Sequence, residues 1–266
     1  MERRIPFVGP MKSGKSSLLC ALVRHDVLPR RSHVMTTVAT RVVLGEHSHP
    51  ALRIDQRLVD RISEQLNSPV DMENLSRWPD LARFHHRVRQ GGIEVRTQTH
   101  GAEGIRRQLH EINELARLGG RAVDWLPEIR LPGGTGLPLV FIDTPGVAPH
   151  DAVVPEHLAQ AHGCVVVLDY TQLGSTEEAV FAERLQPLLD RLDRVWIVVN
   201  RVDQRRQHAD RNCACTADAA RALFGRDDLE VFETSAELAM AAGPHARTRS
   251  GVQLLSDALI CVKGQL

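Results

Sequence analysis

"GPMKSGKSS", residues 9–17, has the spacing of a phosphate-binding loop, Gly9-x-x-x-x-Gly14-Lys15-Ser16. The apolar run "RIPFVG" before it predicts a short buried strand, and "KSSLLCALVRH" after it predicts a helix. In that context the backbone N–H groups of the loop and the start of the helix form a nest for an anion. We expect Lys15 to reach the β- and γ-phosphates of a nucleotide and Ser16 to give its hydroxyl to Mg²⁺.

The loop also holds most of the lysine in the chain. Among 33 basic residues only Lys12, Lys15 and Lys263 are lysine, and the rest are arginine. The compact ammonium of lysine suits a phosphate cradle in a way that the planar guanidinium does not. The loop residues that we expect to contact the nucleotide are Gly9, Met11, Lys12, Ser13, Gly14, Lys15, Ser16 and Ser17.

Further apolar and β-branched runs alternate with helical stretches along the chain. The predicted strands cover residues 36–45, 137–146, 164–170, 194–200 and 229–236. The runs at 164–170 and 194–200 contain the continuous apolar stretches "CVVVL" and "VWIVV", as in strands buried on both faces of a parallel sheet. The sequence therefore predicts an α/β fold with a doubly wound, mostly parallel sheet. One helix should start at a capping box formed by Ser175 and Glu178, and Pro187 should interrupt it or end its first part.

Residues 46 to about 125 depart from this alternation. Apolar residues recur there at helical spacing, at Ile54, Leu58, Ile62 and Leu66, at Leu81, Phe84 and Val88, and at Ile105, Leu109, Ile112 and Ala116. We predict a helical insertion between the threonine-rich stretch and the strand that ends in "DTPG". Residues 126–143 then read as a β-hairpin with "GGTG" as its turn.

Three further motifs follow predicted strands. "DTPG" spans Asp143 to Gly146; we expect Asp143 to act through the Mg²⁺ shell and the Gly146 amide to meet the γ-phosphate. "NRVD" spans Asn200 to Asp203 and is close to the guanine-reading pattern N-K-x-D, with Arg201 in the place of lysine. A carboxylate such as that of Asp203 can accept hydrogen bonds from guanine N1–H and from the exocyclic amine, which adenine does not offer in that arrangement.

"TSA", which includes Ser235 and Ala236, matches the weak base-contacting element of GTP-binding proteins. The order of the motifs, from the phosphate loop through a threonine and D-x-x-G to N-[KR]-x-D and S-A, is that of a regulatory GTPase. A generic ATPase would not need the Asn–Asp pair. The sequence therefore predicts GTP or GDP as the ligand.

Composition excludes several other classes of protein. The formal net charge is +0, and no basic patch interleaved with aromatic residues is present, so direct binding to nucleic acid is not expected. No apolar run approaches the roughly 18 residues of a membrane helix, so direct membrane insertion is not expected either. Five scattered cysteines fit reduced thiols in the cytoplasm. The stretch "HADRNCAC" is a poor match to zinc-ligand spacing.

The stretch from "GPMKSGKSS" to "VMTTVATRV", together with "VVVLDYTQLGSTEE" and "VVNRVDQRR", resembles the G domain of the dynamin family. The resemblance covers residues 5 to 240 and is strongest to a bacterial branch that includes a clamp-binding GTPase of sister-replication-fork colocalisation. It implies that Thr36 is the switch I threonine that closes over Mg²⁺ and the γ-phosphate, with Thr37 as the alternative register. It also implies that Ser16, Thr36 and Asp143 serve the metal and that Lys15, Thr36 and Lys12 take part in catalysis.

The resemblance further implies Mg²⁺-dependent GTP hydrolysis that is stimulated when two G domains pair transiently. We expect residues 1–266 to form one such G domain without a stalk or a membrane-binding segment, and a replication-associated or stalk-bearing protein as the partner. Val147 occupies the position at which small GTPases have a water-orienting glutamine. Lys12 stands where dynamins have a polar residue that helps to hold a monovalent cation. Its ammonium could replace that cation, or it could point to solvent or to a partner. The alternative function is a GTP-gated interaction module with little turnover.

Overall fold

The computed structural model describes residues 2–29, 37–66, 79–91, 95–119, 126–133, 139–146, 153–205, 213–241 and 244–261. The chain divides into two compact units. The first unit comprises Met1–Glu2 and Val27–Pro145, and the second comprises Arg3–Asp26 and Gly146–Leu266.

The second unit is built on four parallel strands in the order β1 (Arg3–Val8), β7 (Cys164–Asp169), β8 (Val195–Asn200) and β9 (Glu230–Glu233). All six residues of β7 are buried, as the apolar run at 164–170 predicts. Because the strands are parallel, their carboxyl ends lie at one edge, and Asp169 at the end of β7 is in register with Asn200 at the end of β8.

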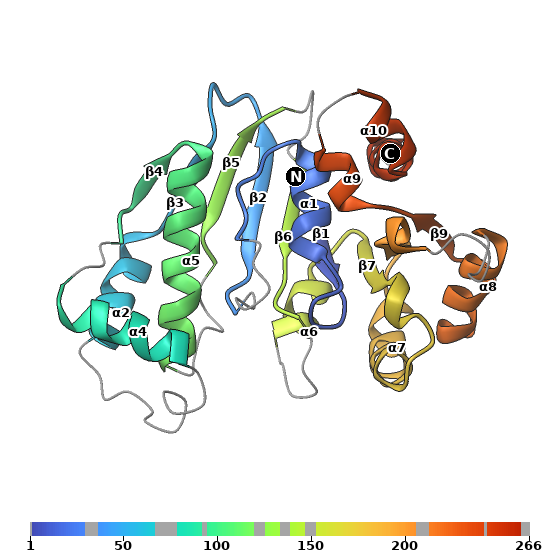
Figure 1. Cartoon of the computed structure of the whole chain (residues 1–266), viewed down its shortest axis with the longest axis horizontal. Coiled ribbons are helices and arrows are strands. Elements are labelled where there is room, and N and C mark those ends of the chain that lie inside the picture. Colours follow the sequence, from blue (N-terminus) through green and yellow to red (C-terminus); the bar gives the residue numbers. More distant parts are fainter. Residues whose placement is uncertain are drawn as a thin grey trace. The chain divides into compact units, whose positions relative to one another are not determined.

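Helices cover both faces of these strands. They are α1 (Lys15–Val23), α6 (Val153–Ala159), α7 (Thr176–Leu189), α8 (Cys213–Phe224), α9 (Ala236–Met240), α10 (Pro244–Arg249) and α11 (Val252–Cys261), with short 3₁₀ turns η1 (Tyr170–Gln172) and η2 (Val202–Gln204). Figure 1 shows α9 and α10 on one side of β9 and α7 and α8 on the other. The core under α7 and α8 includes Leu168, Phe181 and Ile197. The predicted doubly wound α/β arrangement is confirmed in this unit.

Helix α7 differs from its prediction in one respect. Ser175 caps it as expected, since its hydroxyl accepts from the N–H of Glu178 at 3.3 Å. Pro187, however, lies inside the helix, which continues to Leu189. Proline removes one hydrogen bond of the helix, but Leu185 and Leu189 are both buried on the same face. Their packing therefore holds the last turn helical, and the predicted interruption is wrong.

The first unit has five strands in the order β4 (Gln98–His100), β3 (Ala51–Arg53), β5 (Glu128–Pro132), β2 (Thr40–Gly45) and β6 (Leu139–Asp143). Strand β2 is parallel to β5 and antiparallel to β6, while β3 is antiparallel to both β4 and β5. Within the two units, parallel pairs outnumber antiparallel ones, in agreement with the predicted mostly parallel sheet.

The predicted hairpin over residues 126–143 is wrong, although both of its strands exist. Strand β2 lies between β5 and β6, and Val42 is in register with Ile129 on one side and with Phe141 on the other. The β-branched residues of β2 form a ladder with each neighbour, which leaves β5 and β6 no shared edge. Of the predicted "GGTG" turn, residues 134–136 lie outside the described residues.

The insertion contains the predicted helices, α2 (Gln56–Leu66), α4 (Pro79–Arg89) and α5 (Ala102–Gly119). It also contains the three-residue strands β3 and β4, which the helical periodicity did not indicate. Helix α5 packs on β3 and β4 and contacts α2 and α4 near one of its ends (Figure 1). Its apolar face, at Ile105, Leu109 and Ile112, is fully buried, which explains the helical periodicity.

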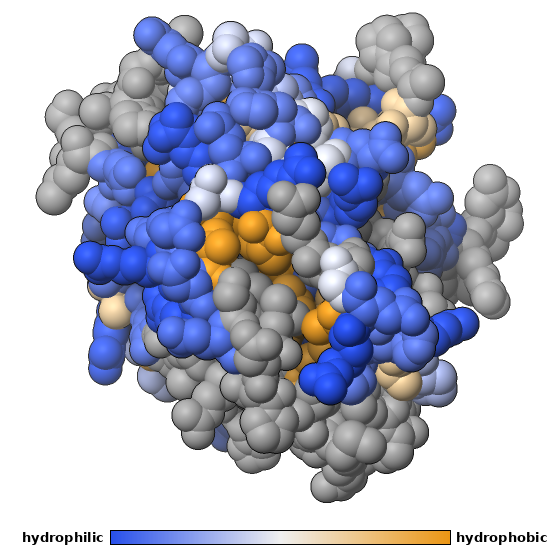
Figure 2. Space-filling model, turned by 90° about the vertical axis from the view of Figure 1, so that its left-hand side faces the viewer, coloured by the Kyte–Doolittle hydropathy of each residue, from blue (hydrophilic) through white to orange (hydrophobic). Residues whose placement is uncertain are grey.

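Figure 2 shows the side of the molecule on which α2, α4 and α5 lie. Hydrophilic residues dominate that face, and hydrophobic residues gather near its centre. The hydrophilic residues of this face are expected of the exposed sides of amphipathic helices. Among the described residues, no helix is both long enough and apolar enough to cross a membrane.

Candidate nucleotide-binding site

Close contacts within the second unit require glycine at positions 9 and 14 of the phosphate loop. A Cβ atom on Gly9 would lie 2.2 Å from the Val167 carbonyl oxygen and 2.8 Å from Ser13 Oγ. Gly14 has a φ of +91°, and a Cβ there would lie 2.3 Å from Asn200 Nδ2. The loop is therefore pressed against the ends of β7 and β8, and only glycine allows this approach.

Lys15 lies inside the loop that it is predicted to serve. It is buried, and its ammonium donates to the carbonyl oxygens of Gly9 at 3.0 Å and Pro10 at 2.9 Å. These neutral acceptors hold the charge within the loop. A phosphate oxygen is a stronger partner for the same ammonium, because a hydrogen bond between charged groups is shorter and stronger than one to a neutral acceptor.

Lys12 has a different environment. It is exposed, with a φ of 63°, a left-handed conformation that costs an L-residue about 1 kcal/mol. Across the described part of the chain we observe no hydrogen bond or ion pair of its ammonium. The loop geometry therefore presents Lys12 outward, in contrast to Lys15.

The serines of the loop are placed around the start of α1. Ser13 is 1% exposed, and its hydroxyl has no hydrogen-bond partner among the described residues. A buried hydroxyl without a partner costs about 1–3 kcal/mol, so Ser13 is suited to a ligand or water that completes its bonding. Ser16 and Ser17 are partly exposed in the first turn of α1.

Gly146 of "DTPG" belongs to the second unit and packs against the phosphate loop. A Cβ on Gly146 would lie 2.7 Å from Met11 Cγ and 2.8 Å from Met11 Cα. Met11 itself is 45% exposed. The structure thus brings these two predicted nucleotide-contacting residues together, and a larger residue at position 146 would displace the loop.

Asn200 joins the phosphate loop to the "TSA" segment. It is 2% exposed; its Nδ2 donates to the Ser13 carbonyl at 3.4 Å. Its Oδ1 accepts from Thr234 Oγ1 at 3.3 Å and from the Ala236 N–H at 3.1 Å. From the sequence we predicted Asn200 as a nucleotide contact; the structure adds this clamp, which the motif alone does not reveal.

Ser235 completes the same region from the other side. It is 1% exposed, its hydroxyl accepts from the N–H of Leu238 at 3.0 Å to cap α9, and its own N–H donates to the Ser250 carbonyl at 2.8 Å. The neighbouring Thr234 carbonyl accepts from the Val202 N–H at 3.2 Å. Hydrogen bonds therefore connect the "NRVD" and "TSA" segments.

Asp203 and Arg201 follow Asn200 in the turn η2. Asp203 is exposed, and no hydrogen bond to its carboxylate is present among the described residues. Arg201 has a φ of 67°, and its Nη1 lies 2.5 Å from Asp169 Oδ2. Asp169 also accepts from the N–H and hydroxyl of Thr171 at 2.9 and 2.8 Å. Sequence reasoning missed Asp169, although its place at the end of a strand adjoining β8 was the available signal.

Glu178 binds the backbone of Asp169 through its carboxylate. It is 1% exposed and accepts from the N–H groups of Asp169 at 3.1 Å and Gly174 at 3.2 Å. Burial raises the pKa of Glu178 to about 7, against the lowering effect of these two hydrogen bonds. The predicted capping box is therefore only half formed: Ser175 caps Glu178, whereas the Glu178 carboxylate bonds Asp169 and Gly174.

The remaining predicted residues belong to the first unit. Asp143 ends β6, is 1% exposed and is in register with Thr40 of β2. Thr36 lies outside the described residues. Thr37, the alternative register, donates through its N–H and its hydroxyl to Asn113 of α5.

The donor set predicted for magnesium suits that ion. Ser16, Thr36 and Asp143 offer hydroxyl and carboxylate oxygens, the hard ligands that Mg²⁺ prefers. Among the described residues, no three or more His, Cys, Asp or Glu side chains are grouped so that they could hold a metal ion by themselves.

Comparisons with known proteins point to one family. The family model described as "Dynamin family" matches residues 5–202. The clamp-binding protein CrfC of Escherichia coli strain K12 is 28% identical over 263 residues, which cover 84% of this chain and 34% of that protein. The chain thus spans about a third of the length of this relative.

Among solved structures, a chain from an oligomerised bacterial dynamin pair, described as a mechanism for long-range sensing and tethering of membranes, has a TM-score of 0.61. It is 18% identical, and the match covers 98% of this chain and 45% of that one. At this identity the likeness shows the shared fold.

Proposed function

Because the chain belongs to the dynamin family, we propose that it binds GTP with Mg²⁺ and hydrolyses it to GDP. The observation that carries the proposal is the Asn200 clamp. It joins the phosphate loop to the "TSA" segment and leaves the Asp203 carboxylate exposed three residues later. A loop that holds phosphates and a carboxylate that reads guanine are thereby parts of one surface in the second unit.

Guanine selection falls to Asp203 and Arg201. The Asp203 carboxylate accepts from N1–H and from the exocyclic amine of guanine. Arg201 is held by Asp169, so its side-chain stem can cover the base although the family's usual lysine is absent. Ser235 and Ala236 contact the base from the neighbouring segment. The same Asn200 clamp holds this segment in position.

Hydrolysis rests on charge around the β- and γ-phosphates. Lys15 moves its bonds from the Gly9 and Pro10 carbonyls to phosphate oxygens, and the Gly146 N–H meets the γ-phosphate. Ser16, Thr36 and Asp143 would hold Mg²⁺, which neutralises charge that develops on the phosphates. Val147 cannot orient water as a glutamine does, so another group must position the attacking water.

Lys12 supplies the further positive charge in this proposal. Its ammonium is unpaired among the described residues, and the side chain is exposed on the loop. It would support the β–γ bridging oxygen in the transition state in place of a monovalent cation.

We expect wild-type turnover to be independent of potassium and Lys12→Ala to lose that potassium-independent activity, by roughly tenfold or more. Alanine keeps a Cβ in the same left-handed conformation, so the change removes the ammonium without relaxing the backbone. Phosphate release with and without potassium measures the effect, with Lys263→Ala as the control for lost charge. Unchanged turnover in Lys12→Ala would remove this role and leave Lys12 facing solvent or a partner.

We also propose that two G domains pair transiently and that pairing stimulates hydrolysis. The experiment that tests the proposed function is GTP and ATP turnover by the purified chain over a range of protein concentrations. We expect activity specific for GTP that rises per molecule with concentration. Turnover of ATP at the same rate would contradict the guanine site, and GTP turnover per molecule that stays constant would contradict pairing.

The second candidate function is a GTP-gated interaction module with little turnover, favoured by Val147 in the glutamine position. Tight GTP binding with negligible phosphate release would support it. In either case the partner we propose is a replication-associated or stalk-bearing protein, because the similar protein of E. coli is named for binding a clamp. We place the protein in the cytoplasm and propose no direct nucleic-acid contact and no membrane insertion.

A further inference from the structure

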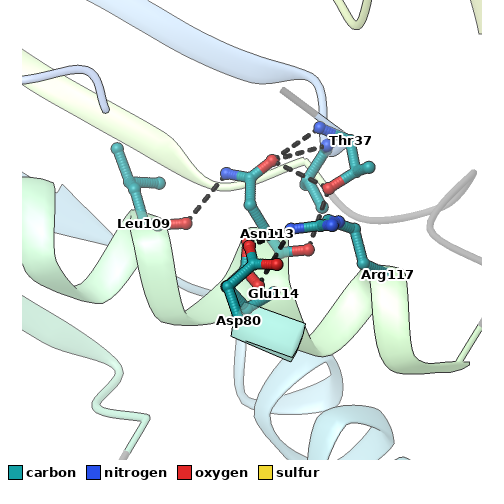
Figure 3. A network of polar contacts seen from close by, with 7 residues as sticks. Thr37, Asp80, Leu109, Asn113, Glu114 and Arg117 are labelled. Carbon is teal, nitrogen blue, oxygen red and sulfur yellow. Dashed lines mark hydrogen bonds and ion pairs between the residues drawn. The ribbon is translucent and has the colours of Figure 1, made fainter. Parts of the chain in front are cut away.

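Asn113 of α5 binds the chain where switch I passes into β2. Its Oδ1 accepts from the N–H of Thr37 at 2.7 Å and from the N–H of Val38 at 3.0 Å. The Thr37 hydroxyl is shared between the Asn113 carbonyl oxygen at 2.9 Å and Oδ1 at 3.1 Å. The Asn113 Nδ2 donates to the Leu109 carbonyl at 2.8 Å. Figure 3 shows these bonds converging on one side chain.

The arrangement fixes the backbone at a defined point. Asn113 is 2% exposed and Val38 is 0% exposed, so water does not compete for these hydrogen bonds. Two successive N–H groups that precede β2, which begins at Thr40, are satisfied by one side-chain oxygen. Since Thr37 directly follows Thr36, the Asn113 side chain sets one end of the switch I segment.

The part of α5 that carries Asn113 is itself held in place. Arg117 Nη1 lies 2.8 Å from Glu114 Oε1 and 3.7 Å from Asp80 Oδ2 of α4. The side chains of Arg117 and Glu114 are 6% and 4% exposed, so screening by water is weak. Figure 3 shows this ion-paired group immediately beside Asn113. The Asn113 side chain therefore extends from a part of α5 that ion pairs hold in place.

We propose that Asn113 is a positioning residue for GTP hydrolysis and that the insertion, through α5, sets the geometry of switch I. The inference rests on the proposed function and on Thr36 as the switch I threonine. Lys15 and the phosphate loop hold the ground state of the nucleotide, whereas switch I acts on the metal and water as the γ-phosphate is transferred. A loosened end of switch I should therefore lower kcat more than it raises KM.

The variant that tests this is Asn113→Ala, with Gln108→Ala as its matched control. Gln108 is also a buried amide of α5, 5% exposed, but it binds Thr99 and the Arg96 carbonyl instead of switch I. We expect Asn113→Ala to lower kcat by roughly tenfold or more with KM and the affinity for a non-hydrolysable GTP analogue within about twofold of wild type. Gln108→Ala should retain the wild-type kcat.

A second readout does not need turnover. Exchange of the Thr37 and Val38 amides with deuterium should accelerate in Asn113→Ala and stay at the wild-type rate in Gln108→Ala. Equal falls of kcat in both variants, or unchanged kcat in Asn113→Ala, would overturn the positioning role. Unchanged exchange of the two amides would overturn the anchor itself.

Failure of the proposed function gives a different result. If the wild-type chain does not hydrolyse GTP, the catalytic role of Asn113 fails with it, and amide exchange alone decides whether the anchor exists. If Asn113→Ala does not fold, Asn113→Leu fills a similar buried volume and removes the oxygen that accepts from the Thr37 and Val38 N–H groups. It should lower kcat as Asn113→Ala would, and a wild-type kcat in Asn113→Leu would then overturn the proposal.

Discussion

Replacing Lys15 by alanine is expected to lower GTP turnover by roughly 100- to 1000-fold, the loss seen when one preorganised donor to a developing negative charge is removed. Lys15 is buried, and its ammonium lies between the Gly9 and Pro10 carbonyls at the inside of the phosphate loop. Of the two other lysines in the sequence, Lys12 faces outward and Lys263 lies far from residues 9–17 along the chain. Affinity for GTP should fall as well, since in our proposal the ammonium contacts the phosphates in the ground state.

Steady-state phosphate release and titration with a fluorescent GTP analogue measure both effects. Lys263→Ala is the matched control, because it removes one lysine charge without touching the loop. The melting temperature of Lys15→Ala should be recorded, since its two carbonyl partners lose a donor. A Lys15→Ala protein that is folded and retains turnover within a few fold of wild type would contradict the assignment of this loop to the nucleotide.

Asp203→Ala is expected to weaken GTP binding by roughly 100-fold or more and to abolish the preference for GTP over ATP. The carboxylate makes two hydrogen bonds to guanine in our proposal, and hydrogen bonds to charged groups contribute about 1.5–3 kcal/mol each. Stability should not change, because Asp203 is exposed and has no hydrogen-bond partner among the described residues. This separates a binding defect from a folding defect.

Competition between GTP and ATP for the purified variant measures the preference directly. Asp227→Ala removes another exposed carboxylate of the second unit and serves as the control. If Asp203→Ala keeps the wild-type ratio of GTP to ATP affinity, Asp203 does not read the base. The clamp at Asn200 would then have only a structural role.

Several errors of the sequence prediction share one physical cause. The apolar runs of β5 and β6 were correctly identified as strands, but their pairing was assigned to neighbours in sequence. In the structure β2 separates them, because Val42 pairs with Ile129 on one side and with Phe141 on the other. The strands β3 and β4 are only three residues long, too short to give a period of two against the helical pattern around them.

Pro187 illustrates the opposite case, in which packing overrides a local rule. A proline inside a helix costs a hydrogen bond, and the sequence offers no sign of what compensates it. In the structure Leu185 and Leu189 flank it and are buried in the core of the second unit. Burial of two leucines is worth several kcal/mol, comparable to the roughly 3 kcal/mol that the proline costs.

The sequence by itself determined the phosphate loop, the order of the GTPase motifs and the alternation of strands and helices, because each of these depends on residues a few positions apart. Only the tertiary structure showed how Asn200 binds Ser13 across 187 positions, how Asp169 holds Arg201 across 32, and how Asn113 holds Thr37 across 76. A buried amide or carboxylate must find a hydrogen-bond partner. The residue type in the sequence shows that a partner is needed, but not which residue provides it. Which partner it is depends on how the strands and helices pack, and that packing is a property of the whole chain.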